Sequence, residues 1–345
     1  MSIQKSFKGF HDKIKLGYSD TEYSTAKIKD SSITAAVKAA FKDEGYSVVD
    51  DFIQGSFSTH TAIKSKDGDF DIDRAVVIDY QDSPDNPIEP KKVVLDVLEK
   101  RGFKNAKIKK PCVTADYKSE NLHIDFPIYR NNNGTLELAV GKANSNQDNR
   151  EWAISDPKGL RSWIKDSSTY GNSAELKQQQ FNRLVRYVKR WRDHKFTDDS
   201  VRSKVYSIGL TVMLKADFVW ALDDDGYPDD LKALRDTISS VISTNYFRFI
   251  GVDQYKVQVM LPKAPYRDIF DGSSTNTGSQ LRNKLNSLKS KLDEAIAETD
   301  NTKKCQILNK LFGDDFEIPD DTKGANNIRK AVYSSAGAVG TSQGA

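Results

Sequence analysis

The stretch Gln54-Gly55-Ser56-Phe57, followed by Asp69-Phe70-Asp71-Ile72-Asp73, decides how this chain is interpreted. The glycine has no Cβ, so the backbone can approach a phosphate closely, and the serine offers that phosphate a hydroxyl and a backbone N–H. Asp71 and Asp73 are two residues apart, which places both carboxylates on one face of a strand, about 6.6 Å apart along it. Carboxylates at this spacing can bind two Mg²⁺ ions held ~3.5–4 Å apart, with substrate phosphates as further ligands. The sequence therefore predicts a phosphate-binding turn followed by a metal-binding strand.

The surrounding segments favour a metal site over a solvated acidic strand. Apolar residues precede the turn in Val48–Ile53 and follow the carboxylates in Ala75–Ile78. A carboxylate that enters a buried strand is costly unless a cation pairs with it. Asp69 shares the strand face of the two later aspartates, so Asp69 and Asp71 form an alternative metal pair.

Composition indicates a soluble globular protein. Of 345 residues, 37% are hydrophobic and 29% are charged, and the length fits two domains or one bilobal domain. No apolar run approaches the ~20 residues that span a bilayer, and no apolar signal segment opens the chain. Cys112 and Cys305 are the only cysteines, so we expect reduced thiols and a cytoplasmic location. The net charge of +3 is too small to indicate a nucleic-acid partner by itself.

The pattern along the chain changes from strands with helices to helices near residue 150. We expect an N-terminal helix plus a sheet-containing core in residues 1–150 and a helical lobe in residues 151–333. The clearest helix is expected over 174–192, where one apolar stripe has cationic flanks. Residues 334–345 are rich in Gly, Ala and Ser, and we expect a disordered tail there.

Asp125 supplies a third carboxylate. It lies between Ile124 and Phe126 in the strand-like run Leu122–Tyr129. A nucleotidyltransferase site of the polymerase-β type takes its third carboxylate from a neighbouring strand, where that group acts on the attacking hydroxyl. By itself Asp125 would be read as a surface residue near a sheet edge. The turn and the carboxylate pair favour a third ligand and base.

Several segments together resemble the cGAS/DncV-like nucleotidyltransferases of bacterial anti-phage signalling, in their DncV-like branch. The resemblance rests on Gln54–Phe57, Phe70–Asp73, Leu122–Pro127, Ser155–Pro157 with Trp163, Leu184–Asp193 and Phe312–Phe316. It implies an α+β fold, with a polymerase-β-type core of mixed sheet flanked by helices, a C-terminal helical lobe, and an active-site cleft between the two.

The resemblance also implies an activity and a ligand set. Members join ribonucleoside triphosphates, here ATP or GTP, into a cyclic di- or trinucleotide and release pyrophosphate. Asp71, Asp73 and Asp125 would hold two Mg²⁺ ions, for which Mn²⁺ can substitute. The preferred pair is Asp71 and Asp73, because DncV-like members carry an acidic residue two places earlier. Arg74, directly after the pair, departs from the apolar or acidic residue usual in the family.

By the same resemblance, the nucleotide-binding residues are Gln54, Gly55, Ser56, Lys189 and Ser207. Ser56 would contact the terminal phosphate, and Lys189 would reach the triphosphate from the long helix. Without the resemblance, Lys189 would be read as part of a solvated helix flank. Ser207 in an apolar helix would be expected to bond its own backbone.

The resemblance also bears on partners of this protein. The resemblance implies a downstream cyclic-nucleotide effector and, for the C-terminal Ala345, conjugation by an E1/E2-like enzyme. No zinc-ligand cluster of the animal DNA sensor is present in the sequence, so activation by DNA is not supported. The alternatives are a linear nucleotidyltransferase acting on RNA ends, protein or a small molecule, and a catalytically inactive nucleic-acid-sensing protein.

Overall fold

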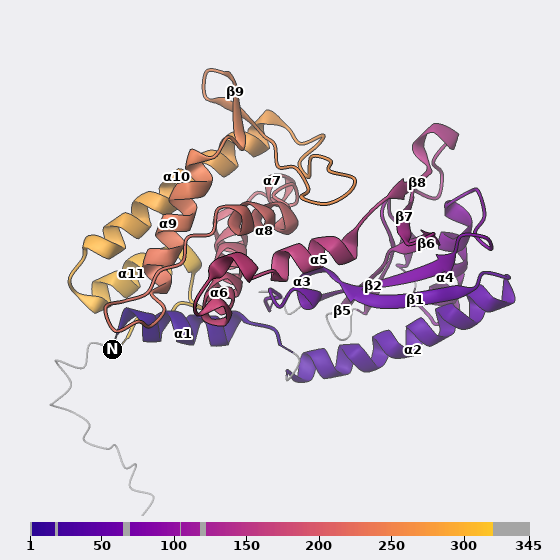
Figure 1. Ribbon diagram of the computed structural model, residues 1–345, viewed down its shortest axis with the longest axis horizontal. Coiled ribbons are helices and arrows are strands. Elements are labelled where there is room, and N and C mark those ends of the chain that lie inside the picture. The colour runs from indigo at the N-terminus through magenta and orange to yellow at the C-terminus, as the bar shows by residue number, and fades with distance from the viewer. Residues whose placement is uncertain (1, 18–19, 65–69, 104, 118–121, 320–345) are drawn as a thin grey trace, which may run out of the picture.

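The computed structural model describes residues 2–17, 20–64, 70–103, 105–117 and 122–319, so Asp69 and the expected tail 334–345 lie outside the described residues. A core built on a sheet stands beside a lobe of helices (Figure 1). This arrangement confirms the predicted polymerase-β-type fold, with its mixed sheet flanked by helices and its C-terminal helices.

The sheet is organised around one central strand. In the described residues it has eight strands: β1 (Val48–Gln54), β2 (Phe70–Asp79), β3 (Lys107–Ile108), β4 (Val113–Tyr117), β5 (Leu122–Phe126), β6 (Ile128–Asn132), β7 (Thr135–Val140) and β8 (Glu151–Ile154). β2 pairs antiparallel with β1, and it pairs parallel with both β5 and β6. β5 leads to β4 and β3, whereas β6 leads to β7 and β8.

Pro127 divides the run 122–129 into β5 and β6. Proline has no N–H to donate to a neighbouring strand, so the ladder is interrupted at this residue. Its carbonyl still accepts a hydrogen bond from the Val76 N–H at 3.1 Å. Both halves therefore remain on the same edge of β2.

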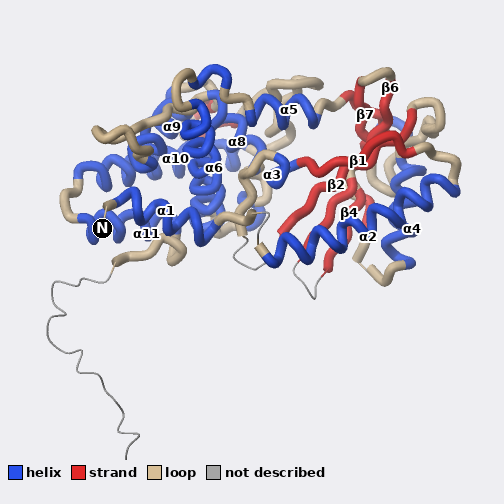
Figure 2. The backbone as a smooth tube through the Cα atoms, turned by 60° about the horizontal axis from the view of Figure 1, so that its bottom comes forward, coloured by secondary structure: helices blue, strands red, loops and turns tan. Residues whose placement is uncertain are grey.

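Two helices cover one face of the sheet. α2 (Thr21–Asp43) and α4 (Ile88–Lys100) bury Ile72, Val76 and Ile78 of β2, together with the alternate residues of β5 and β6. Figure 2 shows α2 lying along the strands. Because strand side chains alternate, Ala75 and Val77 point to the opposite face, where they form a small cluster with Tyr129. Asp73 belongs to that opposite face by the same alternation.

Arg74 has a structural role on the helix-covered face. Its Nε donates to the buried Asp30 of α2 at 3.0 Å, and its Nη1 donates to Asp51 at 3.2 Å. The cation following the carboxylate pair therefore ties α2 to the sheet and points away from the aspartates.

The remaining helices form the second lobe. It contains α1 (Ile3–Ile14), α6 (Ala174–Lys195), α7 (Asp199–Arg202), α8 (Ser207–Ala216), α9 (Asp230–Ser243), α10 (Thr275–Ala297), α11 (Asn301–Phe312) and the hairpin of β9 (Phe247–Gly251) and β10 (Gln254–Val257). α5 (Pro157–Lys165) leads into it from β8 (Figure 1). No helix in the described ranges is long and apolar enough to cross a membrane.

α1 lies in the helical lobe, although it precedes the core in sequence. Phe7, Phe10 and Ile14 are buried in the same apolar cluster as the side chains of α6, α9, α10 and α11. Our sequence boundary at residue 150 grouped this helix with the sheet. The chain therefore passes from the helical lobe to the core and back again.

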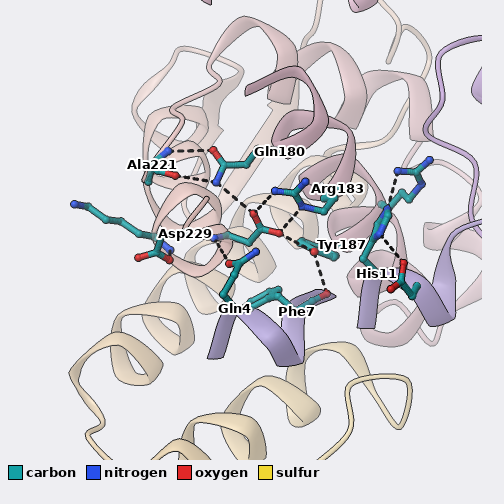
Figure 3. A network of polar contacts seen from close by, with 12 residues as sticks. Gln4, Phe7, His11, Gln180, Arg183, Tyr187, Ala221 and Asp229 are labelled. Atoms are coloured by element: carbon teal, nitrogen blue, oxygen red, sulfur yellow. Dashed lines mark hydrogen bonds and ion pairs between the residues drawn. The ribbon is translucent and has the colours of Figure 1, made fainter. Parts of the chain in front are cut away.

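A buried carboxylate fastens α1 to α6 and α9 (Figure 3). Asp230 is 0% exposed, and it accepts hydrogen bonds from Arg183 at 2.7 and 2.8 Å and from the Tyr187 hydroxyl at 2.9 Å. The Tyr187 hydroxyl also lies 3.2 Å from the Phe7 carbonyl, and the Asp230 N–H donates to the Gln4 side chain at 2.8 Å. The network neutralises a charge that would otherwise be costly to bury.

Replacement of Asp230 tests this network. Asp230→Ala leaves the Arg183 guanidinium buried without its carboxylate, so we expect a loss of about 3–5 kcal/mol in the free energy of unfolding. The adjacent Asp229 caps α9 through the Lys232 N–H, and Asp229→Ala should cost only about 1 kcal/mol. Urea unfolding of both variants measures the difference. Equal losses would contradict the assigned role of the buried network.

Candidate functional site

The turn between β1 and α3 (Gly55–Ser58) requires glycine. Gly55 has φ +67°, which is in the left-handed region that favours glycine. A Cβ at this position would lie 2.0 Å from Asp73 Oδ2. Gln54, the residue before it, pairs with Asp73 in the ladder between β1 and β2. The glycine therefore gives both the sharp turn and the room for a carboxylate.

Hydroxyl groups hold this turn together. Ser58 Oγ donates to the Gly55 carbonyl at 2.9 Å, and Thr59 Oγ1 reaches the carbonyls of Gly55 and Ser56 at 3.3 Å. The Thr61 N–H donates to the Ser56 carbonyl at 2.9 Å. The four-residue helix is thus held by the hydroxyls of its own last residue and of Thr59, and the Ser56 carbonyl accepts from both Thr59 Oγ1 and the Thr61 N–H.

The register between β2 and β5 brings the predicted carboxylates to one place. Asp73 is the register partner of Asp125, and Asp71 is the partner of His123. Partner residues of parallel strands share a face and lie about 4.8 Å apart. The ladder thus places Asp73 and Asp125 together, on the face away from α2 and α4, with Asp71 two residues earlier along β2. The Asp71 side chain is not among the described parts.

Asp125 is stabilised in its charged form. His123 Nε2 lies 3.2 Å from Asp125 Oδ1, and Lys109 Nζ lies 3.8 Å from it. Burial alone would raise the pKa of Asp125, but the hydrogen bond and charge of His123 and the charge of Lys109 bring it below the usual value. Lys109 is therefore engaged with this carboxylate.

A cavity of about 750 Å³ joins most of the predicted residues from both lobes. It is lined by Gln54, Gly55, Ser56 and Asp73 of the core and by Lys189 and Ser207 of the helical lobe. Asp125 does not line it, but its strand position is beside Asp73. The cleft expected between the two lobes is present in the described residues, and it contains the turn, a carboxylate and the long helix.

Lys189 lines this cavity and is buried. The residue is only 4% exposed. Its Nζ donates to the Thr61 carbonyl at 2.9 Å and lies 3.3 Å from Thr61 Oγ1. Burial, with the nearby charges of Arg192 and Arg186, lowers the pKa of Lys189 to about 7. These contacts exclude the alternative of a solvated helix flank.

Ser207 opens α8, and its hydroxyl accepts a hydrogen bond from Arg192 Nη1 at 2.5 Å. Arg192 lines the cavity along with Arg161 and Arg202, and our sequence prediction included none of the three. Arg192 follows Lys189 by three residues, a helical spacing that could have identified it. The other two arginines come from separate helices and have no local signal.

A second cavity of about 510 Å³ adjoins the first at α7 and α8. The two cavities share Arg192, Arg202, Ser207 and Ile208. Two arginines thus lie at the junction of two neighbouring spaces. Each is paired with a carboxylate, Arg192 with Asp193 at 2.6 Å and Arg202 with Asp199 at 2.7 Å.

Known proteins match both the core and the whole chain. Residues 50–129 match the family described as cyclic GMP-AMP synthase DncV-like, nucleotidyltransferase domain. CdnC of E. coli MS115-1, solved with ATP, aligns at 19% identity with a TM-score of 0.64, covering 91% of this chain and 98% of that one.

Two further structures share the fold. The CD-NTase CdnG of Bradyrhizobium diazoefficiens, in complex with GTP, aligns at 13% identity with a TM-score of 0.67, covering 92% of this chain and 97% of that one. DncV of Vibrio cholerae, in its 3'-deoxy GTP bound form, aligns at 16% identity with a TM-score of 0.67, covering 89% and 92%. Residues 50–129 thus match the DncV-like nucleotidyltransferase domain, and the chain as a whole shares the fold of the CD-NTase structures.

Proposed function

We propose that this protein is a nucleotidyltransferase that joins ribonucleoside triphosphates into a cyclic di- or trinucleotide and releases pyrophosphate. The observation that carries the proposal is the cavity between the lobes. It unites the turn at Gly55 and Ser56, the carboxylate of Asp73 and the side chain of Lys189. Phosphoryl transfer relies mainly on such positioning and electrostatic stabilisation.

The residues around the cleft divide into three roles in this proposal. Ser56 and Lys189 bind the phosphates of the incoming triphosphate, one from each lobe. Asp125, whose lowered pKa keeps it ionised, accepts the proton of the attacking hydroxyl. Arg192 holds the Ser207 hydroxyl at the junction of the two cavities.

Asp71, Asp73 and Asp125 would hold two Mg²⁺ ions. Two features support this ligand set: the in-register placement of Asp73 beside Asp125, and the room for the Asp73 carboxylate that a Cβ at position 55 would fill. Oxygen ligands from carboxylates are those that Mg²⁺ prefers. When bound, the ions would neutralise charge on the transferred phosphate.

The size of the site supports a reaction between nucleotides. The cavities of about 750 and 510 Å³ each fall within the range of pockets that hold one small ligand. Two adjacent spaces suit a donor and an acceptor nucleotide. ATP and GTP, which are present in the related structures, are the proposed substrates. A cyclic product would act as a second messenger for an effector in anti-phage defence, as the family resemblance implies.

Product analysis tests the proposal directly. The purified protein is incubated with all four ribonucleoside triphosphates and Mg²⁺, treated with phosphatase, and the products are identified by mass spectrometry. We expect phosphatase-resistant cyclic products of low mass. Linear products, or nucleotides attached to RNA or protein, would instead identify a linear nucleotidyltransferase.

The first prediction concerns the carboxylate pair. Asp71→Asn together with Asp73→Asn should lower the rate of product formation by at least about 10²–10³-fold, because the charge that holds the metal ions is removed. Asp79→Asn, at the other end of β2, is the control and should keep normal activity. Full activity in the single variant Asp73→Asn, with loss in Asp69→Asn, would move the metal pair to Asp69 and Asp71.

The second prediction concerns the turn. Gly55→Ala should abolish detectable Mg²⁺-dependent nucleotide binding, because the new Cβ would displace the Asp73 carboxylate. Gly45→Ala has the same kind of backbone strain, at φ +81°, but no atom lies within 4 Å of its Cβ. Titration with an unreactive ATP analogue compares the two. Equal affinities would show that the space at Gly55 has no functional importance.

The third prediction concerns the proton on Lys189. With a pKa of about 7 in the free protein, the Lys189 side chain is mostly the neutral amine at pH 8. A bound triphosphate favours the charged form, so binding should take up about one proton at pH 8 and almost none at pH 6. Calorimetry in buffers of different ionisation enthalpy measures this uptake. Lys189→Met should eliminate it, and uptake that persists in this variant would contradict the assignment.

A further inference from the structure

The segment Thr61–Lys64, named the strap here, connects two parts of the candidate site. It follows the Gly55–Ser56 turn and precedes β2 in sequence. Its own main chain is tied to the α1–α2 connection, because the Lys64 N–H donates to the Ile14 carbonyl at 2.8 Å and the Ala62 carbonyl accepts from the Leu16 N–H at 3.2 Å. The strap therefore lies where the two lobes meet.

Three cations of α6 bind the strap through its carbonyl groups. Arg186 Nε donates to Ala62 at 3.0 Å, Lys189 Nζ donates to Thr61 at 2.9 Å, and Arg190 Nη2 donates to Lys64 at 2.6 Å. Positions 186, 189 and 190 have the i, i+3, i+4 spacing of one helix face. Two adjacent turns of α6 thus bind three of the four carbonyl groups of the strap.

The positive charge of Arg186 is not neutralised locally. Among the described residues it forms no ion pair, and its second partner is His11 Nε2 at 3.0 Å. One turn earlier, Arg183 pairs with the buried carboxylate of Asp230. A tie that served stability alone would gain more from such a carboxylate than from a carbonyl. Arg186 therefore contributes a hydrogen bond that holds the strap, and its positive charge lies close to the cavity.

The strap is coupled to the turn that precedes it. Thr61 accepts from Lys189 with its carbonyl and donates with its N–H to the Ser56 carbonyl. Thr61 Oγ1 also lies 2.9 Å from Thr59 Oγ1, which in turn bonds the carbonyls of Gly55 and Ser56. A shift of the strap would therefore move the phosphate-binding turn.

We propose that Arg186 and Arg190 are positioning residues for nucleotidyl transfer, which hold the strap on α6 and thereby fix the Gly55–Ser56 turn opposite Lys189. The role rests on the proposed function. Neither arginine touches the substrate in this scheme. Each acts through a main-chain carbonyl, so that the core half of the site keeps its position relative to the helical half.

The experiment compares Arg186→Gln with a matched control. Lys177, on the same helix, is also a buried cation, and it donates to the Tyr170 carbonyl at 2.6 Å, far from the strap in the fold. Lys177→Gln removes the same kind of bond, together with a cation–π contact to the Trp220 ring at 3.7 Å. Amide hydrogen exchange of residues 55–64 in the free protein and steady-state kcat and KM are measured for both variants, with melting temperature as the stability reference.

We expect Arg186→Gln to speed amide exchange in 55–64 and to lower kcat/KM roughly 10–100-fold, because a displaced turn misaligns the triphosphate. Lys177→Gln should change neither. Arg186→Lys, which keeps the charge and a donor, should recover part of the loss. Arg190→Gln, which leaves only the partly exposed Asp315 unpaired, provides a second test of the same effect should Arg186→Gln not fold.

Two results would overturn the positioning role while leaving the proposed function intact. One is product formation at the wild-type rate by both Arg186→Gln and Arg190→Gln. The other is an equal effect of Arg186→Gln and Lys177→Gln on amide exchange and on kcat/KM. Failure of the proposed function looks different, because the wild-type protein itself would then give no nucleotide product, which would remove the positioning role as well.

Discussion

The parallel register between β2 and β5 is the constraint on which the site depends. It places Asp73 beside Asp125 and Asp71 beside His123. A slip of one residue would turn all of these side chains toward α2 and α4, and would expose their apolar neighbours. Ile72 and Ile124, buried partners on the helix-covered face, oppose that slip. The core thus selects its register by hydrophobic burial, and the carboxylates follow from it.

α6 connects this core to the rest of the molecule. Arg183 binds Asp230 within the helical lobe, Lys189 reaches the strap, and Arg192 reaches Ser207 at the start of α8. These three side chains extend from one helix toward three different parts of the molecule. The helix therefore sets the distance between the phosphate-binding turn and the helical wall of the cavity.

The sequence allowed the local motifs of the site to be predicted. It did not allow the contacts between residues far apart in the chain to be predicted. The turn at Gly55 and the carboxylates of β2 have short patterns with a physical cause, and the family resemblance added Lys189. Arg74 could not be interpreted, because its partner Asp30 lies 44 residues away on another element. The contacts of the strap use main-chain carbonyls, which have no residue signature at all. The catalytic roles and the metal ligands remain predictions.

The placement of α1 has a consequence for how the chain is made. Phe7 packs against Tyr187 of α6 and against Phe316 beyond α11, each with ring centroids 5.2 Å apart, so these partners of the first helix both follow the sheet in the chain. A chain elongating on the ribosome at ~5–20 residues per second therefore keeps the apolar face of α1 without these partners until α6 has been made. The carbonyl groups of the strap gain their donors from α6 at the same stage. The strands of the sheet are thus synthesised before the helical wall of the cleft, and a chain that stops ahead of α6 lacks that wall.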